Sequence, residues 1–101
     1  MNLAMSEKQF EKKCVELALF YGWFERKCEW IGRRGCPDRL FIKDGRHVFV
    51  EFKRPDGTGA VAELQLREHE RLEAAGAEVF VVETYAEFRA ALRIESPDDG
   101  V

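Results

Sequence analysis

The chain has 101 residues, of which 46% are hydrophobic and 35% charged, and its formal net charge is -3. This length fits one domain with its own core, and the composition is that of an ordinary globular protein. No run of 18 apolar residues and no apolar N-terminal segment is present, so the sequence predicts neither a membrane span nor a secretory signal. We therefore expect a cytoplasmic protein of a bacterium, encoded by the bacterium or by a phage.

The first half of the chain predicts a helix followed by three strands. Ser6 and Gln9 have the spacing of a capping box, and apolar residues recur at helical spacing up to Gly22, which is suited to end a helix. Aromatic and β-branched residues then predict strands over 23–30, 39–43 and 47–53. A loop with Gly and Pro separates the first two strands, and the hairpin signal Asp-Gly at 44–45 separates the last two.

The second half predicts a helix, a strand and a helix. A loop at 54–59 leads to a helix over 60–75, which Gly76 ends, and a strand over 78–83 follows. Thr84 caps a last helix that runs to about Leu92. We expect one domain over residues 1–93 and a flexible tail over 94–101.

This order of elements predicts an α/β fold. The first three strands can form an antiparallel meander, and a right-handed helical crossover then returns the fourth strand parallel to the third. The segments 40–42 and 48–50 are apolar on both faces, which indicates a mixed central sheet flanked by helices on both sides.

Positive charge is concentrated in the middle of the chain. Residues 25–54 contain nine Lys/Arg and five Asp/Glu, although the whole chain is acidic. This concentration is compatible with a side that faces phosphates, and a solvated loop would show the same count.

Cysteine and histidine do not form a metal-binding pattern. Cys14, Cys28 and Cys36 are odd in number and include no C-x-x-C pair, which argues against a disulfide framework and a structural zinc site. They are expected to be buried or half-buried thiols. His47 and His69 stand alone, and we interpret them as surface or strand residues rather than as ligands.

The candidate chemistry lies on the strand pair between residues 38 and 53. Because side chains alternate along a strand, Glu51 and Lys53 share a face with Phe49, about 7 Å apart at ~3.3 Å per residue. The hairpin brings Asp38 across from them. Two carboxylates in a partly dry cleft repel each other unless a cation lies between them, and all-oxygen ligation favours Mg²⁺ or Mn²⁺, with the Phe52 carbonyl as a further ligand. The alternative interpretation is an ion pair at the edge of a strand.

Four short motifs resemble the VRR-NUC (virus-type replication-repair nuclease) branch of the PD-(D/E)XK superfamily. In chain order they are Gly35-Cys36-Pro37-Asp38, Glu51-Phe52-Lys53, Gln65 and Ala75-Gly76-Ala77. The resemblance extends from about Ser6 to Leu92. It implies a restriction-endonuclease-like αβββαβ core, which agrees with the element order read from the sequence.

The resemblance also implies roles for individual residues. Asp38 and Glu51 would be metal ligands, and Lys53 would be the catalytic lysine, which can orient a nucleophilic water and stabilise charge on the phosphate. Gln65 would be the glutamine on the helix that follows. Glu11 would be an auxiliary acid near the metal. The alternatives are a solvated acid in the first helical turn for Glu11 and an ordinary helix residue for Gln65.

We expect the substrate to be DNA, held by its backbone. Four arginines flank the proposed site: Arg33, Arg34, Arg39 and Arg54. As phosphate contacts they would position DNA without reading its sequence. Nothing in the sequence resembles a recognition helix or a zinc finger, which favours structure-selective over sequence-specific cleavage. The resemblance implies an endonuclease of DNA repair that acts as a homodimer on branched DNA such as four-way (Holliday) junctions. Three aromatic residues could form a dimer patch or belong to the core: Trp23, Phe24 and Trp30.

Other functions remain open at this point. The same fold could serve as a non-catalytic nucleic-acid-binding module, or as a flap or duplex nuclease acting with a partner. The charged residues could also form an ion-pair network in a structural protein.

Overall fold

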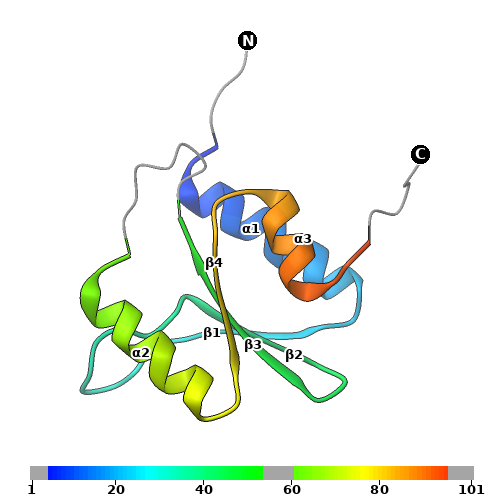
Figure 1. The fold of residues 1–101 in the computed structure, drawn as a ribbon. Coiled ribbons are helices and arrows are strands. Elements are labelled where there is room, and N and C mark those ends of the chain that lie inside the picture. The colour runs from blue at the N-terminus through cyan, green and yellow to red at the C-terminus, as the bar shows by residue number, and fades with distance from the viewer. Residues whose placement is uncertain (1–4, 54–60, 96–101) are drawn as a thin grey trace.

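The computed structural model describes residues 5–53 and 61–95. Within them the order of elements is the predicted one, with three helices and four strands (Figure 1). The helices are α1 (Glu7–Phe20), α2 (Glu63–Ala74) and α3 (Tyr85–Leu92), and the strands are β1 (Phe24–Lys27), β2 (Arg39–Lys43), β3 (Arg46–Phe52) and β4 (Glu78–Val82). None of the helices in these two segments is long and apolar enough to cross a membrane.

Side chains at the helix starts fix where the helices begin. The Ser6 side chain accepts a hydrogen bond from the Gln9 N–H at 3.0 Å, and the Gln9 side chain accepts one from the Ser6 N–H at 2.9 Å. Thr84 forms the same box at the start of α3. The helix predicted from residue 60 begins later, at Glu63, because Ala62 is still extended with φ -67° and ψ 155°.

The four strands form one sheet in the order β1-β2-β3-β4. The first three pair antiparallel, and β4 pairs parallel with β3, which confirms the predicted topology. The first strand is shorter than the predicted 23–30. At its start, the Trp23 N–H donates to the Ala18 carbonyl at the end of α1, at 3.0 Å, so Trp23 belongs to the helix terminus.

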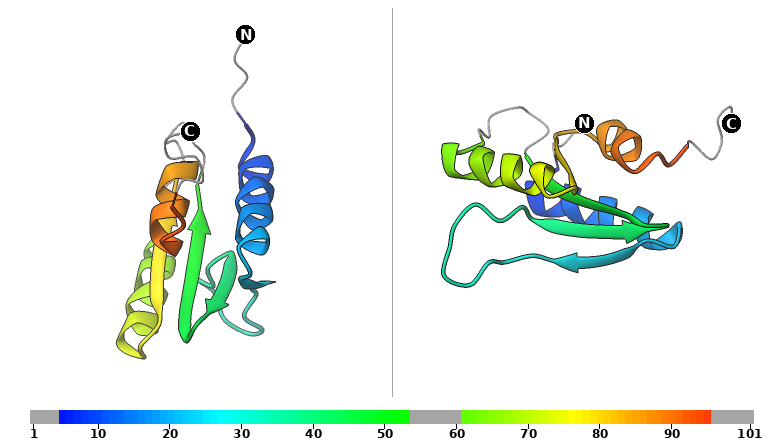
Figure 2. Two further views of the ribbon diagram at one scale, coloured as in Figure 1. Left: turned by 90° about the vertical axis from the view of Figure 1, so that its right-hand side faces the viewer. Right: turned by 60° about the horizontal axis from the view of Figure 1, so that its bottom comes forward.

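The core lies on the face of the sheet that α1 and α3 cover. Phe52 of β3 packs edge-on against Phe10 of α1 at 5.7 Å between ring centroids, and Phe88 of α3 lies 5.3 Å from Phe41 of β2. Ile94, which the sequence placed in the tail, is buried in this core, so the tail prediction is wrong for that residue. The other helix, α2, lies on the opposite side of β3 from α1 (Figure 2).

Candidate active site

Alternation along β3 separates the core from the candidate site. Val48, Val50 and Phe52 face the core, whereas Glu51 faces α2 and is only 3% exposed. The Nζ of Lys53 lies 3.2 Å from Oε2 of Glu51. A buried carboxylate therefore has a neighbouring cation on the same face, as the strand pattern predicted.

Asp38 lies beside this pair at the start of β2. In the register of the two strands Arg39 is opposite Val50, which puts Asp38 level with Glu51. The Phe52 N–H donates to Oδ2 of Asp38 at 2.8 Å. Burial raises the pKa of Asp38 above its ordinary value, although the hydrogen bond from Phe52 works in the opposite direction. The structure thus brings Asp38 and Glu51 together at one end of the strand pair.

Gln65 approaches the same carboxylate from α2. Its Nε2 donates to Oε2 of Glu51 at 2.8 Å, and its Oε1 accepts the Ala62 N–H at 3.2 Å. The second bond fixes which end of the amide faces the sheet. We refer to Asp38, Glu51, Lys53 and Gln65 as the carboxylate site.

The second carboxylate oxygen of Glu51, Oε1, has no partner in the carboxylate site. Oε1 is buried and has no hydrogen-bond partner among the described residues. Burial, followed by the nearby charge of Asp38, raises the pKa of Glu51. A buried carboxylate oxygen without a donor is unfavourable unless a cation or a proton meets it.

These residues fit a hard divalent cation. Within residues 5–53 and 61–95 no three Asp, Glu, His or Cys side chains converge in a metal-binding arrangement. Mg²⁺ needs fewer, because it retains several waters and is commonly held by one or two carboxylates. Asp38, Glu51 and the Phe52 carbonyl are oxygen donors of the kind it prefers.

Glu11 and Arg39 form a separate cluster on the core face. Arg39 donates through Nε to Oε2 of Glu11 at 2.6 Å and through Nη1 to Oε2 of Glu25 at 2.5 Å. We call these three residues the Arg39 cluster. In this arrangement Glu11 is bonded to Arg39, and its charge is close enough to contribute to the raised pKa of Asp38. The Arg39 guanidinium is occupied by two carboxylates, which leaves it poorly suited to contact a phosphate.

The other predicted phosphate contacts lie on or beyond loops. Arg33 and Arg34 are exposed in the loop between β1 and β2, where Arg33 Nη2 lies 3.5 Å from Oε1 of Glu68. Arg54 lies outside the described residues. Of the three aromatic residues considered for a dimer patch, Trp23 is buried in the core, Phe24 is 46% exposed and Trp30 packs on Phe49.

One histidine lies elsewhere than predicted. His47 is exposed, as expected. His69 lies on α2 and is only 7% exposed, so the interpretation of His69 as a surface or strand residue is wrong. It follows Gln65 by one helical turn, and that spacing could have indicated its inward position. All three cysteines are free, as predicted.

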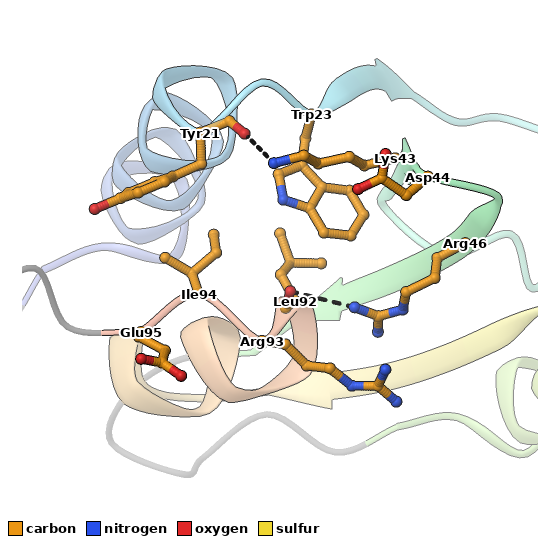
Figure 3. A pocket seen from close by; sticks show the side chains of 9 residues that line it. All are labelled: Tyr21, Trp23, Lys43, Asp44, Arg46, Leu92, Arg93, Ile94 and Glu95. Atoms are coloured by element: carbon orange, nitrogen blue, oxygen red, sulfur yellow. Dashed lines mark hydrogen bonds between the residues drawn. The ribbon is translucent and has the colours of Figure 1, made fainter.

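A pocket of about 480 Å³ lies at the opposite end of β3 (Figure 3). Three cationic residues line it: Lys43, Arg46 and Arg93. Two of them hold backbone carbonyls, since Lys43 donates to Tyr21 at 2.6 Å and Arg46 donates to Leu92 at 3.2 Å. Arg46 also pairs with Glu78 at 2.8 Å. These bonds tie the ends of α1 and α3 to the hairpin, which gives this pocket a structural explanation.

Similarity to individual proteins, rather than to a family model, identifies the family, since no family model matches the chain. The chain is 39% identical over 79 residues, which are 77% of this chain and 83% of the relative, to a protein of Acyrthosiphon pisum secondary endosymbiont phage 1 described as "Putative nuclease p44".

Two solved structures have the same fold. One, described as a VRR_NUC domain, has a TM-score of 0.76 at 33% identity and matches 89% of this chain and 97% of its own. Another, described as a VRR_NUC domain protein, has a TM-score of 0.73 at 16% identity over 90% of this chain and 88% of its own, which supports the fold alone. The αβββαβ core with its mixed sheet, the carboxylate site and these similarities lead to one conclusion: the chain belongs to the VRR-NUC family of nuclease domains, with a restriction-endonuclease-like α/β fold.

Proposed function

We propose that the protein is a deoxyribonuclease that depends on Mg²⁺ or Mn²⁺ and hydrolyses phosphodiester bonds. The observation that carries this proposal is the buried Oε1 of Glu51, which has no hydrogen-bond partner in residues 5–53 and 61–95 and lies beside a second carboxylate, Asp38. A site built only for stability would pair both oxygens, because leaving one unpaired costs about 1–3 kcal/mol.

Each residue of the carboxylate site has a part in this proposal. Asp38, Glu51 and the Phe52 carbonyl would hold the metal ion, which when bound neutralises the carboxylates and polarises the scissile phosphate. Lys53 is 14% exposed at its side chain, and its ammonium can donate hydrogen bonds to an attacking water or to a phosphate oxygen. Gln65 holds Glu51 in place through its 2.8 Å bond.

The substrate in this proposal is branched DNA, such as a four-way junction, cut by a homodimer in DNA repair. One domain with one site cuts one strand at a time, whereas two copies related by a twofold axis present two equivalent sites. Arg33 and Arg34 are exposed, Arg33 lies 3.5 Å from Glu68 on α2, and both are suited to contact phosphates. Glu11 remains an auxiliary acid, which would have to leave Arg39 to reach a metal.

The test is a cleavage panel with single-stranded, duplex, flap and four-way-junction DNA, with Mg²⁺, Mn²⁺ or EDTA. The expected result is cleavage of junction DNA that EDTA abolishes and that Lys53→Ala reduces strongly. Binding without cleavage by the wild-type protein would indicate a non-catalytic module instead. Cleavage in EDTA would contradict the metal mechanism.

A further inference from the structure

The loop between β1 and β2 carries an apolar residue that is almost completely exposed. Ile31 is 99% exposed, which is the highest value among the large hydrophobic side chains of the described residues. It occupies a turn that continues through Gly32, whose φ of +81° suits glycine. Apart from its chain neighbours, no described atom lies within 4 Å of a Cβ added at Gly32, so there is open space on that side of the turn. The loop extends beyond the ends of both strands (Figure 2).

Contacts on both sides of this turn anchor the loop. Before it, the Trp30 ring packs on Phe49 of β3, with 6.2 Å between centroids. After it, Gly35 approaches α2 so closely that an added Cβ would lie 2.8 Å from the Leu64 carbonyl oxygen. An anchored loop presents Ile31 with little freedom left to lose on binding, which favours a role in recognition.

The residues that follow the turn favour a nucleic acid as the partner. Arg33 and Arg34 are both exposed, and the Arg33 side chain is held near Glu68 with 57% of its surface accessible. An apolar side chain next to arginines is the combination that wedges between base steps while the cations contact the flanking phosphates. A protein partner would favour a wider apolar patch around Ile31, whereas its neighbours in the turn are Gly32 and these arginines.

The loop also ends at the carboxylate site. The Cys28 N–H donates to the Asp38 carbonyl at 2.9 Å, which closes the base of the loop beside the candidate metal ligand. Asp38 follows Ile31 by seven positions, so their Cα atoms lie at most about 25 Å apart. That distance spans roughly seven nucleotides of one strand at about 3.4 Å each, so one DNA molecule can reach both.

From these observations we infer that Ile31 is a wedge that inserts between bases at a branch point of DNA, with Arg33 and Arg34 on the adjoining phosphates. The inference rests on the proposed function and deepens it, because the wedge would supply the preference for branched DNA. A base step at a branch is already weakly stacked, so inserting Ile31 there costs less than in a continuous duplex.

The experiment uses a four-way junction with 2-aminopurine next to the branch, bound by the cleavage-deficient Lys53→Ala protein. Fluorescence should rise on binding as the base unstacks. Adding Ile31→Ser should abolish the rise and weaken junction binding about tenfold, with duplex affinity unchanged. Ile31→Leu should retain both effects. Leu66→Ser, which removes an exposed leucine from α2, is the matched control and should behave like its parent.

An unchanged fluorescence rise with Ile31→Ser, or an equal loss of affinity for duplex and junction, would overturn the inference. A change in the sedimentation mass of the Ile31→Ser protein would instead assign Ile31 to a contact between protein copies. These outcomes are independent of catalysis. If the wild-type protein cleaves no DNA with either metal, the proposed function fails, whether or not Ile31 unstacks bases.

Discussion

The Arg39 cluster and the carboxylate site each contain two carboxylates and one cation, on opposite faces of the same sheet. In the Arg39 cluster the cation lies between the two acids and donates to each. In the carboxylate site Lys53 reaches Glu51 alone, and Oε1 of Glu51 has no described partner. The first arrangement is complete without a ligand and stabilises the fold. The second leaves Oε1 of Glu51 unpaired within the described residues, and there the proposed metal ion would bind.

The sharpest test of this difference is Glu51→Gln, which keeps the shape of the side chain and removes its charge. Nuclease activity should fall by about 10³-fold or more, because the proposed metal site loses one of its two carboxylates. Initial rates of junction cleavage with saturating Mg²⁺ measure the effect. Activity within tenfold of the wild type would remove Glu51 from the metal site.

In the Arg39 cluster, Arg39→Met should damage the fold instead. Removing the cation leaves Glu11 and Glu25 facing each other with side chains only 15% and 13% exposed. The loss should be about 2–3 kcal/mol in the free energy of unfolding, less than for a fully buried pair because Arg39 itself is 22% exposed. Urea denaturation measures it.

The matched control is Arg67→Met, which breaks an exposed ion pair with Glu63 one helical turn away. It should change stability by at most about 0.5 kcal/mol. Equal effects of Arg39→Met and Arg67→Met would mean that the Arg39 cluster contributes no more than a surface pair.

An intermediate effect is expected from Gln65→Leu. The substitution removes the donor that holds Oε2 of Glu51, and loss of such a support commonly lowers metal affinity or activity by about 10–100-fold. The Mg²⁺ concentration for half-maximal cleavage should rise. A fall in turnover at an unchanged Mg²⁺ requirement would place Gln65 against the substrate.

The smallest expected effect is the change that Glu51 causes in the pH dependence of folding stability. Because burial raises the pKa of Glu51, the native state holds its proton when the unfolded chain has already ionised. The Glu51 contribution to stability is therefore greatest at low pH and is lost as the pH rises through the native pKa. In EDTA, Glu51→Gln should be more stable than the wild type at pH 7, and the difference should shrink toward pH 4.

Melting temperatures of both proteins across that range measure the difference. Adding Mg²⁺ at pH 7 should raise the melting temperature of the wild type more than that of the variant. A variant that is less stable than the wild type at pH 7 would show that Glu51 is favourably paired without metal.

The sequence predicted the carboxylate site better than the Arg39 cluster, for a physical reason. Strand alternation and the Asp-Gly turn relate Asp38, Glu51 and Lys53 through one hairpin, so local rules suffice. The partners of Arg39 come from α1 and β1, 28 and 14 residues away, and only the packed fold brings them together. The alternation of side chains along the strand nevertheless predicts that Arg39 points to the opposite face of the sheet from Asp38.

Element types and sheet topology were also predictable, whereas some boundaries were not. The start of α2 depends on the extended backbone of Ala62, and Trp23 is held by the end of α1, neither of which leaves a signal in composition. The burial of Ile94 likewise depends on the space between α3 and the rest of the core.

Because the side chains of Asp38 and Arg39 point to opposite faces of the sheet, they also disfavour any other register of β2 on β3. A slip of one residue would turn the arginine toward Glu51 and the aspartate toward Glu11 and Glu25, setting like charges together on the core face. The Phe52 N–H would lose its acceptor in the same step. A chain folded in the slipped register would be unstable, not merely inactive. Insertion or deletion of a single residue within β2 should therefore be selected against because it impairs folding, whatever its effect on catalysis.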